Sequence, residues 1–146
     1  LQNKKNNFMG MIGGKEWIVL VILMGVFTIP YILFLKTLQN TIKEISLENR
    51  KINPNDVWLI LIPFFGIIWQ IVVINKISIS LGDELNKKNI SNNEVKPTFA
   101  LGIAYCILQI LTIIPIVGIL FGLIALILWI IYWVKIDSYK TLLKRD

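Results

Sequence analysis

FALGIAYCILQILTIIPIVGILFGLIALILWIIYWV, residues Phe99–Val134, is the stretch that decides the fold, because its 36 residues include no Asp, Glu, Lys, Arg or His. As one helix it would be about 54 Å long, whereas the hydrocarbon core of a bilayer is about 30 Å thick. The stretch is therefore too long for one membrane span and suits two, folded at Ile113–Gly118. Pro115 and Gly118 favour that turn, since Pro lacks a backbone donor and Gly tolerates a positive φ. The sequence thus predicts a membrane protein.

Four apolar segments separated by charged connections predict an all-α fold, a single domain of four transmembrane helices covering residues 1–146. The segments do not alternate apolar and polar residues, as the strands of a membrane barrel would. The first segment resembles a signal peptide but lacks a small-x-small cleavage site, so we expect it to be retained. We also expect an initiator Met or a short leader to precede Leu1. The expected spans are residues 17–35, 57–75, 99–114 and 117–134.

The composition excludes several classes of function. The chain has a formal net charge of +6, but its basic residues lie in the gaps between apolar segments rather than in a patch with interleaved aromatics, so we expect no nucleic-acid partner. There is no His, which removes most zinc, copper and haem sites. The one Cys, Cys106, lies in an apolar segment and can form no intrachain disulfide or thiolate cage. We therefore expect no metal and no cofactor.

The distribution of Lys and Arg predicts the orientation in the membrane. With four spans, the N-terminal tail, the connection between spans two and three and the C-terminal tail lie on one side, with eleven basic residues. The connection between spans one and two lies on the other side, with four. The side with more positive charge is the cytoplasm, so both termini are expected there. The sequence thus predicts a multi-pass protein with cytoplasmic N- and C-termini.

Three connections continue a span as an amphipathic helix, because apolar residues recur at spacings of three and four. These extensions either lie in the interface, with nearby lysines meeting lipid headgroups, or pack on one another as solvated helix ends. The candidates for headgroup contacts are Lys76, Lys87, Lys88 and Lys135. The apolar positions are Leu35, Leu38, Ile42 and Ile45 after the first span, Ile77, Leu81 and Leu85 after the second, and Trp133, Ile136 and Leu143 at the end.

No expected span has a charged residue near its centre, which argues against proton-coupled transport, voltage sensing and charge-relay catalysis. The polar residues that remain could form helix–helix hydrogen bonds or could line a pore or contact a ligand. They are Gln70, Tyr105, Gln109 and Thr112. Gly118 and Gly122 form a G-x-x-x-G pattern, which favours close packing of the fourth span against a neighbour in the same chain. Asp83 and Glu84 are expected on a solvated helix face rather than in a cation site.

Two short segments resemble each other. Ile62–Ile67 reads IPFFGI and Ile114–Ile119 reads IPIVGI, and each precedes an apolar run containing Trp. This pattern indicates either a parallel duplication of two spans or a bias toward Ile, Gly and Pro. Pro63 either kinks the second span or is a proline in its first turn.

Longer motifs indicate a family resemblance. Glu48–Pro54 (ENRKINP), Val57–Pro63 (VWLILIP) and Ile130–Ile136 (IIYWVKI) carry it, and it extends over residues 38–139. With these segments the chain resembles a family of small four-span bacterial membrane proteins that is frequent in Bacteroidetes-like genomes. The resemblance implies a four-span topology and a bacterial inner membrane, and it implies no catalytic residues.

Three functions compete. The first is an accessory, anchoring or assembly subunit of a membrane complex, with the bilayer and another protein or a second copy as partners. The second is a subunit of a small oligomeric pore, since four short helices with few polar residues enclose no water path alone. The third is an intramembrane enzyme acting on lipid, for which the sequence has no acid, base, metal site or nucleophile. We expect the first, and no enzymatic activity.

Overall fold

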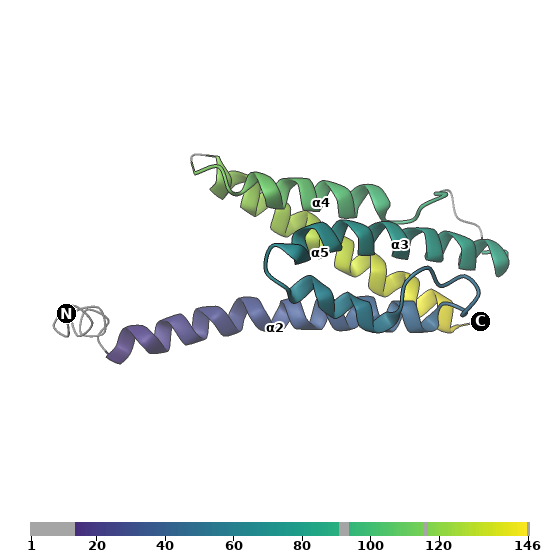
Figure 1. Ribbon diagram of the computed structural model, residues 1–146, viewed down its shortest axis with the longest axis horizontal. Helices are drawn as coiled ribbons and strands as arrows, with labels where there is room; N and C mark the ends of the chain where they lie inside the picture. Colours follow the sequence, from purple (N-terminus) through teal and green to yellow (C-terminus); the bar gives the residue numbers. More distant parts are fainter. Residues whose placement is uncertain (1–13, 91–93, 116, 146) are drawn as a thin grey trace. The chain divides into compact units, whose positions relative to one another are not determined.

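The computed structural model describes residues 14–90, 94–115 and 117–145, and these residues are helical with no strand among them (Figure 1). This confirms the all-α prediction. Four α-helices and one 3₁₀ helix follow one another in this part of the chain. They are α2 (Gly14–Glu44), η1 (Pro54–Leu61), α3 (Phe65–Lys87), α4 (Phe99–Leu111) and α5 (Gly118–Lys144).

The chain divides into two compact units, residues 1–34 and residues 35–146. Helix α2 passes from the first unit into the second. Along residues 17–29 of unit 1 its large apolar side chains are exposed, with Met24 69% and Phe27 66% exposed. A helix that is apolar all round is suited to lipid. This part of α2 corresponds to the first expected span.

Three helices, α2, α3 and α5, are long and apolar enough to cross a membrane. Helix α4 is apolar but has only 13 residues, which gives it a length of about 20 Å. The structure therefore supports a membrane protein with three candidate spans and one short apolar helix, and the four spans expected from the sequence stay a prediction.

The second expected span, residues 57–75, is not one helix. Helix η1 ends at Leu61 and α3 begins at Phe65, and between them Phe64 has a φ of 63°. The indole Nε1 of Trp69 donates to the carbonyl of Asp56 over 2.8 Å, so η1 folds back along the first half of α3. A Cβ on Gly66 would lie 1.9 Å from the carbonyl oxygen of Ile60. Pro63 is therefore part of a turn between two antiparallel segments, not a kink within a span.

Helices α4 and α5 form the second hairpin of unit 2 (Figure 1). One hydrogen bond of the first turn recurs in its turn. The N–H of Gly118 donates to the carbonyl of Ile114 over 2.7 Å, as the N–H of Gly66 donates to that of Ile62 over 2.7 Å. A Cβ on Gly118 would lie 2.4 Å from the carbonyl oxygen of Thr112. Both IPxxG segments thus place their glycine against the backbone of the residue six positions earlier. Duplication and a bias toward Ile, Gly and Pro remain the two interpretations of this likeness.

The core of unit 2 lies where the three helical extensions meet. Their apolar residues are almost completely buried, as the three-and-four spacing predicts for one helix face. The extensions therefore pack on one another, which was one of the two alternatives. Each such Leu or Ile contributes about 1.5–3 kcal/mol by its burial. The residues are Leu35, Leu38 and Ile42 of α2, Ile77, Leu81 and Leu85 of α3, and Ile136 and Leu143 of α5.

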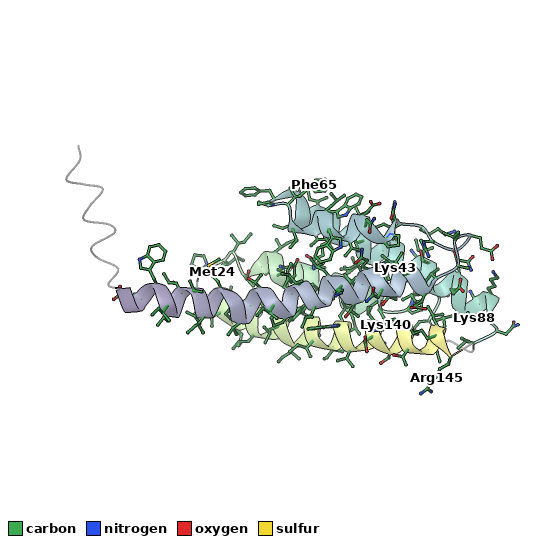
Figure 2. The ribbon with its side chains drawn as sticks, turned by 90° about the horizontal axis from the view of Figure 1, so that it is seen from below. Met24, Lys43, Phe65, Lys88, Lys140 and Arg145 are labelled. Atoms are coloured by element: carbon green, nitrogen blue, oxygen red, sulfur yellow. The ribbon has the colours of Figure 1, made fainter. Side chains whose placement is uncertain are left out.

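The last turns of α2, α3 and α5 lie at the same end of unit 2. The Nζ of Lys144 lies 3.4 Å from the carboxylate of Glu44, and the Nζ of Lys88 donates to the carbonyl of Leu143 over 2.8 Å. Figure 2 shows Lys88 and Arg145 toward one end of this unit and Phe65 toward the other. These helices therefore run parallel to one another within unit 2.

The connection of residues 45–53 lies at this same end, beside the last turns of α3. The Nζ of Lys51 lies 3.2 Å from the carboxylate of Asp83, and the N–H of Lys51 donates to Ser80 Oγ over 2.9 Å. We expected the connections before and after the second span on opposite sides of the membrane, and the structure instead brings them together. The count of eleven basic residues against four depended on that separation, and the orientation of the termini stays a prediction. Lys4 and Lys5 lie outside the described residues.

Candidate functional site

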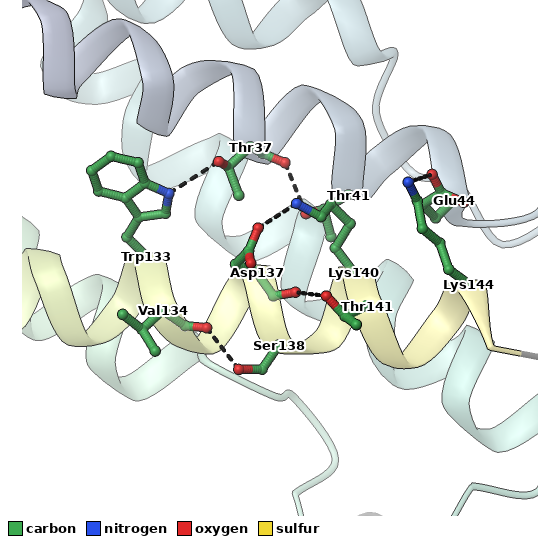
Figure 3. A network of polar contacts seen from close by, with 10 residues as sticks. All are labelled: Thr37, Thr41, Glu44, Trp133, Val134, Asp137, Ser138, Lys140, Thr141 and Lys144. Atoms are coloured by element: carbon green, nitrogen blue, oxygen red, sulfur yellow. Dashed lines mark hydrogen bonds and ion pairs between the residues drawn. The ribbon is translucent and has the colours of Figure 1, made fainter.

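Polar side chains connect α5 to the end of α2 along one edge of the core (Figure 3). The indole Nε1 of Trp133 donates to Thr37 Oγ1 over 3.0 Å, and the Thr41 hydroxyl donates to the Thr37 carbonyl over 2.8 Å. Lys140 forms an ion pair with Asp137 on its own helix. Of these contacts, the bond from Trp133 to Thr37 joins the two helices, and the other two lie within one helix each.

A buried carboxylate joins α3 to the turn that follows α2. Glu84 is 3% exposed. Its Oε2 accepts hydrogen bonds from Ser46 N–H (3.1 Å), Ser46 Oγ (2.5 Å) and Asn49 Nδ2 (2.8 Å). The expectation that Glu84 lies on a solvated face is wrong. Glu84 instead fixes the turn of residues 46–49 against α3.

Burial and hydrogen bonding act in opposite directions on Glu84. Burial acts to raise the pKa of the carboxyl, but the hydrogen bonds from Ser46 and Asn49 and the positive charge of Lys87 outweigh it. The net result is a pKa below the ordinary value of 4.5. Donors directed at the ionised form produce this shift. Glu84 is therefore a charged structural residue at neutral pH.

Arg50 closes the end of α2 on the other side of the same turn. Its Nη2 donates to the carbonyls of Ile45 (2.9 Å) and Lys43 (3.2 Å). Carbonyls at the C-terminal end of a helix lack partners within the helix. A positive charge there also interacts favourably with the negative end of the helix dipole. Two separate polar contacts thus hold the turn after α2.

Four lysines, which we call the lysine collar, each occupy the first charged position at the end of an apolar segment. The side-chain ammonium groups of Lys36 and Lys76 make no hydrogen bond or ion pair with the described part of the chain, whereas that of Lys96 lies 5.2 Å from the centre of the Phe99 ring. Lys135 lies 3.4 Å from the carboxylate of Glu94. The collar consists of Lys36, Lys76, Lys96 and Lys135.

Contacts beside these lysines place them at one level of unit 2. The bond from Trp133 to Thr37 joins α5 to α2 next to two of them. Ser78 Oγ donates to the Pro97 carbonyl over 2.9 Å next to the other two. Gly102 of α4 contacts both α3 and α5 close to the same level. Lysines at the ends of apolar segments extend their charge toward water, so this level fits a membrane–water boundary.

The four lysines expected to contact lipid headgroups differ in their surroundings. Lys87 pairs with Glu48, Lys88 donates to a backbone carbonyl, and Lys135 pairs with Glu94. Lys76 is the one of these four without a partner among the described residues. Contact with lipid headgroups remains a prediction, and the geometry favours Lys76 for it.

The polar residues expected inside the membrane are not brought together as one cluster. Gln70 of α3 is 3% exposed, and its Nε2 has no hydrogen-bond partner in the described structure. Gln109 of α4 is half-buried, and its carbonyl accepts from Thr112 Oγ1 over 2.6 Å. Tyr105 is buried on α4. The structure thus joins Thr112 to Gln109, and it shows no bond between Gln109 and Gln70.

The glycines of the expected G-x-x-x-G both face α4. Gly118 lies against the backbone of Thr112, and a Cβ on Gly122 would lie 3.7 Å from Thr112 Cγ2. Gly102, which the sequence interpretation did not single out, is more tightly enclosed. A Cβ there would lie 2.6 Å from Ile74 and 3.0 Å from Tyr132.

Within residues 14–90, 94–115 and 117–145, no three His, Cys, Asp or Glu side chains lie close enough together to hold a metal ion. A shallow hollow on the outer face of α5 is lined by Asp137, Ser138, Thr141, Leu142 and Arg145. No protein family, no curated protein and no solved structure matches the chain.

Proposed function

We propose that the protein is a non-enzymatic subunit of the bacterial inner membrane that anchors or assembles a membrane complex. The observation that carries this proposal is the construction of unit 2. The last turns of α2, α3 and α5 pack into a polar-surfaced bundle that continues directly from apolar segments. Such a bundle would present a polar surface beside the membrane, which is what an anchoring subunit requires.

The distribution of charge supports an orientation for this platform. Twelve of the fifteen basic residues lie between Lys36 and Arg145, and none lies between Pro97 and Val134. The contacts at the end of α3 gather the connection of residues 45–53 and the residue that follows α3, Lys88, at the end where α5 finishes. Excess positive charge favours the cytoplasmic side. We therefore propose that the platform and the C-terminus are cytoplasmic.

The outward faces of the apolar segments favour the anchoring role over a pore. On the membrane part of α5 the exposed side chains are apolar, including Ile119, Leu123, Ile127 and Val134. A pore formed by several copies needs a polar face directed at its axis. The apolar face of α5 suits lipid or the apolar helix of another subunit. An oligomeric pore is the alternative that the experiment below tests.

In vivo photocrosslinking tests the proposal. A photoreactive residue replaces Ser138, which is exposed beside the hollow on α5, or Leu123, which is 59% exposed in the apolar part. We expect either position to give a single adduct with a different protein, and the purified protein to leave liposomes impermeable to ions. Adducts with a second copy together with an ion leak would support the pore. Absence of any protein adduct at both positions would overturn the anchoring role.

The second expected partner is lipid, and a substitution of Lys76 tests whether this side chain contacts lipid headgroups. A basic residue near an anionic membrane surface contributes about 1 kcal/mol to the interaction, so we expect Lys76→Gln to retain anionic phospholipid about five-fold more weakly. Native mass spectrometry of the protein released from detergent measures the retained lipid. Lys87→Gln is the matched control, because Lys87 already pairs with Glu48. Equal retention by the two variants would contradict a headgroup contact at Lys76.

A further inference from the structure

The hairpin of η1 and α3 begins and ends at the same end of unit 2. At its beginning, Gln39 Nε2 donates to Asn55 Oδ1 over 2.9 Å, which attaches η1 to the last part of α2. At its end, Ser46 and Lys51 contact the last turns of α3. The chain therefore returns to where it started, whereas a helix crossing a bilayer would finish on the opposite side.

The length of the hairpin limits how deep it reaches. From Phe65 to Asn75, just before the lysine collar, α3 has eleven residues, which corresponds to about 16 Å. That is about half of the 30 Å thickness of a hydrocarbon core. The membrane part of α5, from Gly118 to Val134, is about 25 Å long. The first hairpin thus reaches the middle of a bilayer, and the second reaches most of the way across.

The tip of the first hairpin is apolar and exposed. Leu61, Ile62, Phe64 and Phe65 are 48%, 46%, 89% and 44% exposed. Phe64 has a φ of 63°, a conformation that suits Gly and is unfavourable for an aromatic residue. Strain of this kind persists where the surrounding structure imposes it, and it is often found at functional positions. Here it accompanies an aromatic ring that is directed away from the protein.

The backbone of the tip is also suited to lipid, because three of its amides, those of Ile62, Phe65 and Gly66, find acceptors within the turn. The N–H of Ile62 donates to Leu59 (3.1 Å), that of Phe65 to Pro63 (2.7 Å) and that of Gly66 to Ile62 (2.7 Å). Irregular backbone inside a hydrocarbon region requires such internal partners. Pro63 has no N–H to satisfy.

We propose that η1 and the first half of α3 form a re-entrant hairpin, which occupies the acyl-chain region of one leaflet and enters from the side of the lysine collar. The side chain of Phe64 lies near the bilayer midplane, and its partners are acyl chains. We infer that lipid rather than protein surrounds the tip. The tip is exposed and lies beside the apolar faces of unit 2, and its distance from the lysine collar fixes its depth in the bilayer. This proposal does not depend on the anchoring role.

Cysteine labelling tests the sidedness. In a Cys106→Ser background, Leu47→Cys lies before the hairpin and Asn86→Cys lies after it, both at exposed positions. A membrane-impermeant maleimide is applied to spheroplasts and to inverted vesicles, with labelling in denaturing detergent as the control for reactivity. We expect both cysteines to react in the same preparation, which is inverted vesicles if the platform is cytoplasmic as proposed above. Reaction of the two cysteines from opposite sides would overturn the proposal.

A spin label tests whether lipid surrounds the tip. It is attached to Phe64→Cys in the same background, in nanodiscs of phosphatidylglycerol and phosphatidylethanolamine. We expect high accessibility to oxygen and low accessibility to a water-soluble nickel complex. Low accessibility to both would mean that protein covers the tip, and high accessibility to nickel would place the tip in water; either would overturn the proposal. An unchanged melting temperature relative to the Cys106→Ser parent shows that the labelled protein is folded.

Discussion

Gly66→Ala is expected to destabilise unit 2 by about 3 kcal/mol, the upper end of the usual cost of overpacking. The added methyl would lie 1.9 Å from the carbonyl oxygen of Ile60 and 2.8 Å from its carbon. Both atoms belong to the backbone of η1, so no side-chain rotation relieves the overlap. The hairpin must open or α3 must shift. Thermal unfolding in detergent, followed by tryptophan fluorescence, measures the change, because Trp69 bonds to η1.

Gly122→Ala is the matched control for this substitution. It adds the same methyl group to a helix of the second hairpin, but the nearest atom is Thr112 Cγ2 at 3.7 Å, an ordinary contact distance. We expect it to be neutral or to stabilise slightly, since Ala favours helix more than Gly does. If Gly66→Ala were as stable as this control, η1 would not be packed on α3.

The helical extensions could be predicted from the sequence because their packing follows a local pattern. Leu35, Leu38 and Ile42 recur at the spacing that places them on one helix face, and the structure buries them. The same reasoning applies to Ile77, Leu81 and Leu85. Burial on one face depends on residues three and four positions apart, so it can be read without knowing the partner helix.

The direction of the second apolar segment could not be predicted in this way. Hydropathy along residues 57–75 is the same whether the chain crosses the membrane or turns back at Pro63 and Phe64. The first-turn interpretation of Pro63 came closest, since α3 begins two residues later. The positive φ of Phe64 has no signal in the sequence, because an aromatic residue rarely adopts it. A tertiary contact at Gly66 decides the turn.

The lysine collar was partly visible in the sequence, since each of its members ends an apolar segment. Glu84 was not identified, although a signal existed. It lies seven residues after Ile77 and three after Leu81, on the face that these residues bury. Its neighbour Asp83 is half-exposed and pairs with Lys51, which made the pair look solvated. The donors of Ser46 lie 38 positions away, a separation that no local pattern reveals.

Glu84→Ala is expected to destabilise unit 2 by about 3 kcal/mol, because it removes the acceptor of three hydrogen bonds and leaves part-buried donors on Ser46 and Asn49 without one. Chemical unfolding in detergent measures the loss. Asp83→Asn is the control from the adjacent position. Its ion pair with Lys51 is exposed, so the expected loss is within about 1 kcal/mol.

Acidification tests the same contact in a second way, because it neutralises the carboxylate of Glu84 without removing the side chain. Because the pKa of Glu84 is lower in the folded state than its ordinary value of 4.5, the unfolded chain takes up this proton first. The stability that Glu84 contributes is therefore present above pH 4.5 and is lost as the pH falls through the lower, folded pKa. Glu84→Gln removes that titration, so the stability of this variant should fall less than that of the wild type below pH 4.5. Parallel pH curves for the two proteins would show that Glu84 is not held as an ionised acceptor by Ser46 and Asn49.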